Sequence, residues 1–416
     1  MRIIYKTMRL IYTIGIHLYT IGIRMAAFFG HKKARLMVKG WNGVYAALGK
    51  LSRYKPTVWF HAASLGEFEQ ARPVLEAYRQ RHPDCQVLVT FFSPSGYEVR
   101  KNYAQADAVC YLPMDTPSNV RRFVKKVNPD EVFFVKYEFW YNYLNALREH
   151  DAKTYIFSAI FRPEQYFFKP WGRWYLQQLR HCFTHLFVQN EESLRLLKSH
   201  GIYNCSIAGD TRFDRVHQIA LAAESDPVAE QFLGGHTGPV LVAGSTWPPD
   251  EQLLAQIKND KLRIILAPHL IDEDHLRQIE TLFPGSIRYS AIKSHKGNKS
   301  SRVLVIDNIG LLSKLYRYAT VAYIGGGFGV GIHNTLEAVT FGKPVLFGPK
   351  YHKFQEAHDL IARGGGFSHA DGAELEQHLK TLLSHPDALA AASQACLNYM
   401  RENLGSTDTI LNHIEK

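Results

Sequence analysis

Two glutamates in the N-terminal half follow apolar, β-rich runs and can act as bases. Glu67 lies in HAASLGEFEQ (His61–Gln70), directly after the run Val58–Ala63, and Glu138 lies among aromatic residues in a similar position. Small residues at the end of a strand leave room for a substrate, and a carboxylate near the next helix N-terminus is stabilised as an anion. A general base must be deprotonated and within hydrogen-bond reach of the hydroxyl that it activates. Helix capping by Glu67, and a helix N-terminal charge at Glu138, fit the same spacing.

An arginine, Arg212, lies in the segment GDTRFD (Gly209–Asp214), which follows the last strand-like run of the N-terminal half. The planar guanidinium of an arginine on such a loop can bind a phosphate or a carboxylate through two parallel hydrogen bonds. A surface salt bridge with Asp210 or Asp214 would use the same side chain. The sequence leaves both interpretations open.

Three polar residues follow strand-like runs of the C-terminal half. Ser245 and Thr246 end the first of these runs, and their hydroxyls and backbone N–H groups can contact a phosphate. His269 follows the next run in the tripeptide Ala267–His269. A lone histidine is more often structural than functional, so this pattern alone does not assign His269 to a site.

A glycine-rich turn, GGGFGVGIHNTLE (Gly325–Glu337), is the strongest local signal. A glycine turn that leads into a helix lets a phosphate approach the backbone at the positive end of the helix dipole, which makes Gly326 and Gly327 candidate contacts. Glu337, one helical turn in, is placed to bind the two hydroxyls of a ribose. No GxGxxG register fits, so the turn is not a dinucleotide fingerprint. A purely structural glycine turn is the alternative.

The elements that position these residues alternate between apolar strand-like runs and longer amphipathic segments, which indicates parallel βαβ units. The runs of the first series are Val58–Ala63, Gln86–Phe92, Ala108–Leu112, Glu131–Val135, Thr154–Ala159, His185–Gln189 and Cys205–Gly209. A second series follows a polar, Gly-rich stretch and comprises Pro239–Ser245, Arg263–Pro268, Arg302–Ile306, Val321–Gly326 and Pro344–Gly348. We therefore predict an α/β protein with two Rossmann-like, doubly wound domains facing a cleft. Such sheets bind ligands outside the carboxyl ends of their strands.

The net charge of +11 is concentrated at the N-terminus. Residues 1–66 contain eleven Lys or Arg and no acidic residue, whereas the remaining 350 residues carry 38 basic and 38 acidic side chains. The basic residues flank an apolar, aromatic run, Leu10–Ile23, which is shorter than the roughly 20 residues that span a bilayer as a helix. A longer span would bury Arg24, so we predict an anchor that lies in the membrane interface and faces anionic lipid, not nucleic acid. An ordinary amphipathic core helix is the alternative.

Cysteine and histidine patterns give no metal site. The five cysteines are scattered without a CxxC pair, and the twenty histidines show no shared metal-ligand spacing. This usage indicates reduced thiols in a cytosolic compartment. P-loop, HExxH and GxSxG motifs are absent from the sequence as well. The Ser-, Gly- and Lys-rich stretch Lys293–Ser301 is expected to be an exposed loop.

Together these features resemble the bacterial 3-deoxy-D-manno-octulosonic acid (Kdo) transferases, family 30 glycosyltransferases with the GT-B fold. The resemblance extends along nearly the whole chain and depends on the order and spacing of several motifs. Besides the basic, apolar N-terminus, they are HAASLGEFEQ (His61–Gln70), YEFWYNYL (Tyr137–Leu144), GDTRFD (Gly209–Asp214), GSTWPPDE (Gly244–Glu251), APH (Ala267–His269) and GGGFGVGIHNTLEAVTFGKPVLFGP (Gly325–Pro349).

This resemblance implies a reaction and a set of roles. Kdo would pass with inversion from CMP-Kdo to the lipid A precursor at the cytoplasmic face of the inner membrane, in lipopolysaccharide biosynthesis. No metal or other cofactor is expected, because cations and helix dipoles stabilise the leaving phosphate. Glu67 is implied as the general base, Glu138 as a second acidic group near the acceptor, and Arg212, where the family generally has lysine, as a contact to the donor phosphate. The residues that match the CMP pocket are Ser245, Thr246, His269, Asn334 and Glu337, with Glu337 expected on the ribose.

The domain boundaries expected from these patterns divide the chain into four parts. They are a membrane-associating segment at 1–35, an acceptor domain at 36–225, a CMP-Kdo-binding domain at 236–390, and a C-terminal helix at 391–416 that packs back on the N-terminal domain.

Two motifs depart from the family pattern. The family often has an Asn-Ala-Arg-Leu-Ser element where this chain has Ser158–Pro163, which displaces Arg162 and leaves its role open. Trp247–Pro249 interrupts the usual acidic run after Thr246. The number of Kdo residues added is not determined by the sequence. Alternatives to Kdo transfer are another GT-B transferase or epimerase that uses a UDP donor, and a non-catalytic, basic membrane-docking or nucleic-acid-binding protein.

Overall fold

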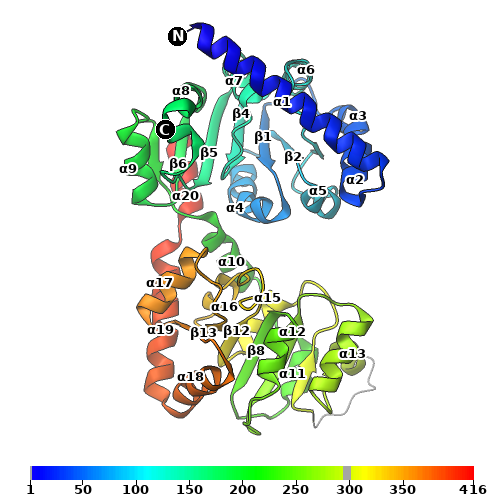
Figure 1. Ribbon diagram of the computed structural model, residues 1–416, viewed down its shortest axis with the longest axis vertical. Helices are drawn as coiled ribbons and strands as arrows, with labels where there is room; N and C mark the ends of the chain where they lie inside the picture. The colour runs from blue at the N-terminus through cyan, green and yellow to red at the C-terminus, as the bar shows by residue number, and fades with distance from the viewer. Residues whose placement is uncertain (1, 294–300) are drawn as a thin grey trace. The chain divides into compact units, whose positions relative to one another are not determined.

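The computed structural model describes residues 2–293 and 301–416, and the chain divides into two compact units (Figure 1). The first unit comprises Met1–Arg215 and Gly405–Lys416, and the second comprises Val216–Leu404. The first unit thus ends about ten residues before the boundary at 225 that the sequence suggested. Most of the predicted loop Lys293–Ser301 lies outside the described residues.

A seven-stranded parallel sheet forms the centre of the first unit, in the order β3-β2-β1-β4-β5-β6-β7. Its strands are β1 (Thr57–Ala62), β2 (Gln86–Phe91), β3 (Ala108–Tyr111), β4 (Glu131–Val135), β5 (Lys153–Ala159), β6 (His185–Val188) and β7 (Cys205–Ile207). Every residue of β1 and β2 is buried, because helices cover both faces of the sheet. This is why these strands appear in the sequence as continuous apolar runs and not as an alternation of apolar and polar residues.

Helices connect the strands of this sheet in βαβ fashion. They are α4 (Leu65–Arg81), α5 (Pro94–Arg100), α6 (Pro117–Val127), α7 (Tyr141–Glu149), α8 (Arg173–Cys182) and α9 (Glu191–Ser199), with two short 3-10 helices at Tyr166–Phe168 and Pro170–Gly172. Helix α10 (Thr211–Leu221) follows the last strand of the sheet. Three further helices precede the sheet: α1 (Arg2–Phe28), α2 (Lys32–Asn42) and α3 (Val44–Leu48).

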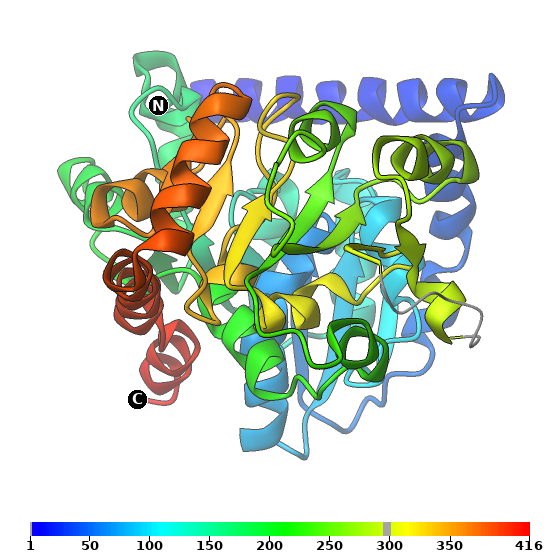
Figure 2. The same ribbon diagram turned by 90° about the horizontal axis from the view of Figure 1, so that it is seen from below.

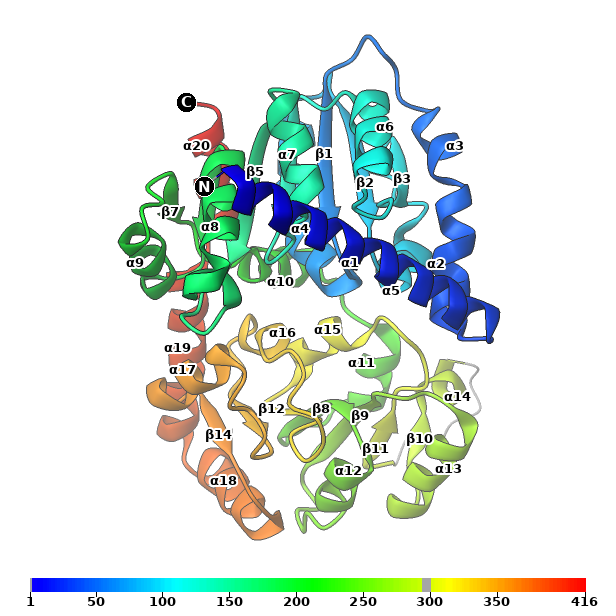
Figure 3. The ribbon, with the colours of Figure 1, turned by 45° about the horizontal axis from the view of Figure 1, so that its top comes forward.

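The N-terminal helix α1 is one continuous helix that is longer than the apolar run predicted from the sequence (Figure 2). It crosses the first unit from α8 to α2 (Figure 3). The hydroxyl of Tyr12 donates a hydrogen bond of 2.7 Å to Asp115, and Tyr12 also packs against Tyr141 at the start of α7. Asp115 follows β3 and α7 follows β4, so α1 lies at the carboxyl ends of the strands.

A second seven-stranded parallel sheet forms the centre of the other unit, in the order β10-β11-β9-β8-β12-β13-β14. Its strands are β8 (Val240–Thr246), β9 (Arg263–Pro268), β10 (Ile287–Arg288), β11 (Val303–Val305), β12 (Val321–Ile324), β13 (Val345–Phe347) and β14 (Gly366–Ser368). The helices of this unit are α11 (Pro227–Leu233), α12 (Pro248–Leu254), α13 (Glu273–Leu282), α14 (Tyr289–Lys293), α15 (Leu312–Leu315), α16 (Leu336–Val339), α17 (Gln355–Arg363), α18 (Gly372–Ser384) and α19 (Pro386–Asn403), with a 3-10 helix at Tyr316–Tyr318.

The last helix, α20 (Ser406–Ile414), returns the chain to the first unit. The predicted C-terminal helix is therefore two helices, of which α20 alone belongs to that unit. Ile410 and Leu411 are fully buried in a core shared with α4. The carboxylate of Asp214 accepts hydrogen bonds from the backbone N–H groups of Gly405 and Thr407, at 2.8 and 2.7 Å, and so holds the start of α20.

Candidate functional site

Glu67 lies in the first turn of α4, immediately after β1, and it caps that helix. Its Oε2 atom accepts hydrogen bonds from the backbone N–H groups of Ala63, at 2.6 Å, and Ser64, at 3.3 Å. The capping interpretation left open by the sequence therefore holds in the structure. The other carboxylate oxygen, Oε1, accepts no hydrogen bond from any residue that the structure describes. Capping thus fixes the carboxylate through one oxygen and leaves the second able to accept a proton.

The pKa of Glu67 is raised above its ordinary value. Burial is the largest cause, and the negative charge of Glu138 adds to it, while the Ala63 N–H bond and the charges of His61 and Lys136 act in the opposite direction. A carboxylate with a raised pKa is a stronger base than an ordinary glutamate. Glu138, the other acidic residue predicted from the sequence, is therefore close enough for its charge to act on Glu67.

The Glu138 side chain follows β4 and is held by two donors. Its Oε2 atom accepts hydrogen bonds from the indole N–H of Trp140, at 2.7 Å, and from Nε2 of His61, at 3.1 Å. Two directed donors favour one orientation of the carboxylate and stabilise its negative charge.

His61 is a buried residue of β1 that the sequence analysis did not single out. Its Nδ1 atom lies 2.8 Å from the hydroxyl of Thr90, and the same hydroxyl oxygen accepts a hydrogen bond of 2.7 Å from the Trp59 indole. Because that oxygen already accepts from Trp59, its own hydrogen is available to donate to Nδ1 of His61. The Nε2–H group of His61 then donates the hydrogen bond to Glu138. A histidine inside an otherwise apolar strand is the sequence signal that could have indicated this network.

Glu69, two residues after Glu67 in the same motif, has a different role. Its carboxylate contacts Arg100 at 2.6 Å, Arg215 at 3.0 Å and Arg72 at 3.2 Å. Burial acts to raise the pKa of Glu69, but the three arginines together lower it below its ordinary value. Glu69 is thus a structural anion, which distinguishes it from Glu67.

The arginine predicted to bind phosphate, Arg212, lies in the first turn of α10 and pairs with Asp210. Its Nε atom lies 2.8 Å from Oδ2 of Asp210, and Gln70 donates a hydrogen bond of 2.8 Å to Oδ1 of the same carboxylate. The salt-bridge interpretation is therefore realised, and contact with a phosphate stays a prediction.

Several of these charged groups act on the pKa of Tyr137. Burial raises its pKa, Arg162 and Arg212 lower it, and Asp210 and Glu67 raise it further. The displaced Arg162 therefore lies within electrostatic range of the same region as Arg212 and Glu67. Tyr137 follows Lys136, whose φ of 58° is unusual for a residue other than glycine. Such backbone conformations are concentrated at functional sites.

In the second unit, Asp250 connects two predicted loops. Its Oδ2 atom accepts hydrogen bonds of 2.9 Å from the backbone N–H groups of Trp247 and Gly326, and its Oδ1 atom accepts one from Tyr323. The N–H of Gly326 is therefore already bonded within the protein. A Cβ atom at Gly327 would lie 2.6 Å from the backbone of Gly348, so this glycine has a packing reason as well. Phosphate binding at both glycines stays a prediction.

Ser245 and Thr246 occupy the end of β8. Ser245 has a φ of 54°, which is again rare for a residue with a side chain. The buried hydroxyl of Thr246 donates a hydrogen bond of 2.9 Å to Glu251. Thr246 is thus engaged in the interior of the unit, and Ser245 is the more accessible of the two predicted phosphate contacts.

The ring of His269 packs against two other rings, those of Trp247 and His333. Its imidazole lies 4.7 Å from the indole of Trp247 and 4.5 Å from the ring of His333. The Trp247 indole N–H donates to Nε2 of His333 at 3.2 Å, and burial followed by the charge of His269 lowers the pKa of His333. The Trp247 that departs from the family pattern therefore packs against the predicted ligand residue His269. Sequence analysis missed His333 as part of this group.

Asn334 and Glu337 lie together beyond the glycine-rich turn. The Asn334 amide donates to Glu337 at 3.1 Å, and its oxygen accepts from the N–H of Leu336. The helix α16 that follows the turn has only four residues. A helix dipole is the sum of aligned peptide dipoles, so one turn supplies little of it. A helix does follow the glycine-rich turn, but it is a single turn, and phosphate binding there stays a prediction.

Among the described residues no group of three His, Cys, Asp or Glu side chains is placed to hold a metal ion, and all five cysteines are free and buried.

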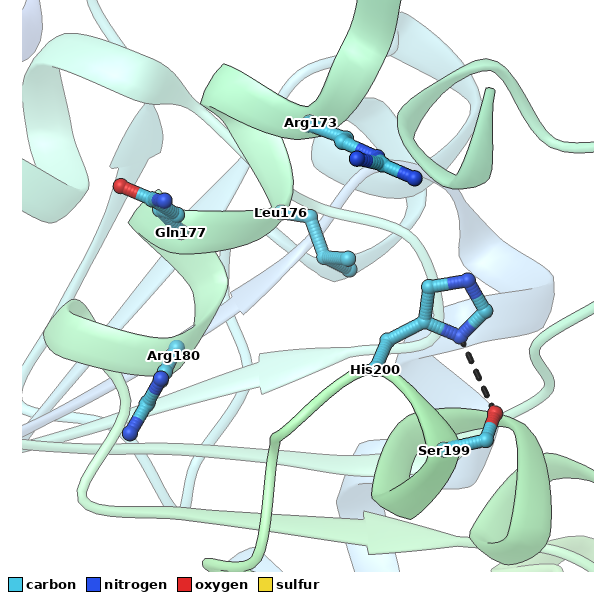
Figure 4. Close-up of a pocket in the computed structure, with 6 residues that line it drawn as sticks. All are labelled: Arg173, Leu176, Gln177, Arg180, Ser199 and His200. Carbon is cyan, nitrogen blue, oxygen red and sulfur yellow. Dashed lines mark hydrogen bonds between the residues drawn. The ribbon is translucent and has the colours of Figure 1, made fainter. Parts of the chain in front are cut away.

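A pocket of the first unit lies between α8 and α9, with a volume of about 300 Å³ (Figure 4). It is lined by Arg173, Leu176, Gln177, Arg180, Ser199 and His200, none of which the sequence assigned to the site.

Comparisons with known proteins identify relatives of the chain. Residues 39–215 match the family model described as 3-deoxy-D-manno-octulosonic-acid transferase (kdotransferase). The Kdo transferase of Aquifex aeolicus is 26% identical over 341 residues, which cover 80% of this chain and 88% of the relative. That of Rickettsia felis is 26% identical over 376 residues, or 86% of this chain and 79% of the relative. The resemblance to the Kdo transferases is confirmed.

Solved structures agree on the fold. A UDP-GlcNAc 2-epimerase from Neisseria meningitidis, bound to UDP-GlcNAc, matches with a TM-score of 0.61 at 15% identity, over 86% of this chain and 99% of that one. A putative UDP-N-acetylglucosamine 2-epimerase from Listeria monocytogenes matches with a TM-score of 0.59 at 13% identity, over 87% and 96%. At such identities the likeness bears on the fold alone. The predicted α/β class, with two Rossmann-like domains of GT-B type and an apolar N-terminal helix, is confirmed.

The Kdo transferase family model covers the part of the chain that holds Glu67, Glu138 and Arg212. The structure brings these three residues to one end of the first sheet, where β1, β4 and β7 end. The residues predicted to bind CMP lie in the second unit, at the ends of β8, β9 and β12. Their roles in a Kdo transferase stay predictions.

Proposed function

We propose that this chain is an inverting glycosyltransferase that moves Kdo from CMP-Kdo to the lipid A precursor, with Glu67 as the base. The Kdo transferase relatives support Kdo transfer in lipopolysaccharide biosynthesis. The observation that carries the residue assignment is the carboxylate of Glu67, which is anchored through Oε2 and has a raised pKa. A carboxylate at that position can accept the proton of an acceptor hydroxyl as the hydroxyl attacks the sugar.

Glu138 supports the base without replacing it. Glu138 is held by Trp140 and His61, and its charge acts to raise the pKa of Glu67, which favours proton uptake by Glu67. Proton transfer to Glu67 relieves the repulsion between the two carboxylates. The network of His61 thereby acts on the base through Glu138, as a positioning group.

Donor binding is assigned to the second unit. Ser245 and the ring of His269 are accessible candidates for contacts to the CMP, and Glu337 is the candidate for the ribose hydroxyls. Arg212 in the first unit is the cation proposed to meet the donor phosphate, for which it would exchange its present partner Asp210. A guanidinium binds phosphate through two hydrogen bonds and so stabilises the leaving group without a metal.

The proposed location is the cytoplasmic face of the inner membrane. Within α1, the segment Thr7–Phe28 is long and apolar enough to cross a membrane by length and composition alone. Large apolar side chains of the helix are exposed, among them Leu10, Ile11, Ile14, Leu18, Ile21, Met25 and Phe28. The helix is also fixed to the folded unit through Tyr12 and Ile23, which favours a helix lying in the interface over one that leaves the unit to span the bilayer.

Incubation of the full chain with CMP-Kdo and the lipid A precursor, followed by mass spectrometry of the lipid, tests this function. We expect an increase in lipid mass that corresponds to one or more Kdo residues, and no product with UDP-sugars. The fold shared with UDP-GlcNAc 2-epimerases makes a UDP-dependent enzyme the second candidate. Binding of UDP in preference to CMP, without lipid product, would select that candidate instead.

A further inference from the structure

A cavity of the first unit lies beside α1 and is separate from the residues assigned to transfer. It is formed by α1, the junction of α2 and α3, and the segment that leads from β3 into α6, and its volume is about 340 Å³. The lining includes Thr20, Arg24, Trp41, Tyr45, Asn119 and Arg122. It contains no acidic side chain, so the cavity combines two guanidinium groups with polar and aromatic neighbours.

Arg122 is held in place by an aromatic ring. Its guanidinium lies 3.8 Å from the ring centroid of Tyr45, a cation–π contact that limits the orientations of the side chain. Among the described residues neither Arg122 nor Arg24 forms an ion pair with a carboxylate. Two uncompensated cations around one cavity favour an anionic occupant, and a planar guanidinium is suited to the oxygens of a phosphate.

The position of the cavity on α1 indicates where the anion comes from. Thr20 and Arg24 are one helical turn apart on α1, between exposed apolar residues of the same helix. Leu18, Ile21 and Met25 have exposed fractions of 63%, 53% and 55%. A molecule bound in this cavity would therefore contact two arginines next to an apolar surface of α1. A lipid, with an anionic headgroup and apolar chains, has both properties.

We propose that this cavity is a headgroup site for an anionic phospholipid, whose phosphate is bound between Arg24 and Arg122. The inference rests on the proposed membrane location and adds a specific site to it. The bound headgroup, together with the exposed apolar side chains of α1 inserted into the lipid, would hold α1 at a fixed depth and rotation in the interface. The first unit would then keep one orientation toward the membrane.

A site of defined geometry differs from a diffuse positive charge in its response to charge-conserving variants. Arg122→Lys keeps the charge but loses the planar fork and its stacking on Tyr45, so a specific site weakens. Binding through diffuse surface charge would not be weakened by this change, because the positive charge is kept. Arg180 provides the matched control, because it lines the basic pocket between α8 and α9, which has nearly the same volume and does not involve α1 (Figure 4).

The experiment measures co-sedimentation of the full chain with vesicles of phosphatidylcholine, with and without phosphatidylglycerol. For the vesicles that contain phosphatidylglycerol, we expect a partition coefficient lowered about thirty-fold by the pair Arg24→Ala and Arg122→Ala. Arg122→Lys should lower it about three- to five-fold. Arg180→Ala and Arg180→Lys should change it by less than about two-fold. Kdo transfer to a detergent-dispersed acceptor should be unchanged in all variants, which separates this site from the transfer reaction.

Other outcomes overturn the headgroup site. If Arg122→Lys binds as the wild type does, or if the Arg180 variants lose as much binding as those of Arg122, the attraction is diffuse charge. Binding of inorganic phosphate is measured without vesicles at constant ionic strength. If the Arg24 and Arg122 variants lose phosphate binding but partition to the phosphatidylglycerol vesicles as the wild type does, the site binds free phosphate and not a lipid. If the wild type shows no Kdo transfer, but vesicle binding still differs between the wild type and the variants as expected, the proposed enzyme activity is rejected and the headgroup site is retained.

Discussion

Replacement of Glu67 by glutamine separates the two roles that this residue has in the structure. The amide oxygen of Glu67→Gln can still accept the hydrogen bond from the N–H of Ala63, so α4 keeps its cap. Glutamine cannot accept a proton from an acceptor hydroxyl. Loss of a general base reduces turnover by about 10²- to 10⁴-fold, which corresponds to roughly 3–5 kcal/mol of transition-state stabilisation. The free energy of unfolding should fall by less than about 1 kcal/mol.

A neighbouring glutamate on the same helix supplies the matched control. Glu69→Gln keeps a side chain of the same shape but weakens the contacts to Arg72, Arg100 and Arg215. We expect this variant to have a lower melting temperature and nearly normal turnover. The two variants should therefore show opposite patterns, one in catalysis and one in stability.

The assay is the initial rate of Kdo transfer from CMP-Kdo to the lipid A precursor, followed by mass spectrometry, together with thermal unfolding and CMP binding. Glu67→Gln should bind CMP as the wild type does. A Glu67→Gln enzyme that retains more than about one tenth of the wild-type rate would refute the base assignment, because a lost base costs at least about a hundredfold. Equal losses of rate in both variants would point to a general effect on α4 instead.

The remaining predictions concern pH and the attachment of α20. Since the charge of Glu138 raises the pKa of Glu67, Glu138→Gln should move the acid limb of the kcat/KM profile to lower pH, as measured by initial rates across pH. Burial, followed by the charge of the adjacent His413, lowers the pKa of His185 to about 4. The free energy of unfolding should therefore decrease as pH falls from about 6.5 through about 4, and urea titrations of His185→Leu should show a weaker pH dependence. Asp214→Ala leaves three donors at the start of α20 without their acceptor and should cost about 3 kcal/mol or more in urea unfolding.

The central strands of both sheets were predictable from the sequence because both of their faces are buried. A strand such as β1 is a continuous apolar run with clear ends. The strands missed in the second series, Ile287–Arg288 and Gly366–Ser368, are at the two edges of their sheet and have only two and three residues. Runs this short carry too few side chains to establish a pattern.

Residue roles were less predictable, because they depend on contacts between distant segments. Glu67 was a candidate for base or cap, and the structure shows that capping by one oxygen is compatible with a free second oxygen. His61 could not be assigned, because its tautomer depends on Thr90 of another strand. His269 acquires its environment from Trp247 and His333, which lie on two other segments.

The short length of the helix after the glycine-rich turn had a signal in the sequence. Gly342 and Pro344 follow α16 closely, and Gly342 has a φ of 67°. A glycine in the left-handed region ends a helix, and a proline nearby prevents its continuation. The stop signal therefore limits α16 to one turn. Anion binding at this turn would depend on backbone N–H groups and side chains more than on a dipole.

Contacts within the first unit link α1 to the two carboxylates. The ring of Tyr19 on α1 stacks on Phe92 at 6.3 Å, Phe92 lies 5.1 Å from the ring of Trp140, and the Trp140 indole donates to Glu138 at 2.7 Å. If α1 lies in the membrane interface, as proposed, this aromatic path begins at the lipid and ends at the acidic pair. For the proposed lipid acceptor, the rings of Phe92 and Trp140 would offer apolar contacts between the membrane interface and the base. Under the proposed function, the membrane would present the acceptor close to Glu67, and Glu138 would act on the base through its charge.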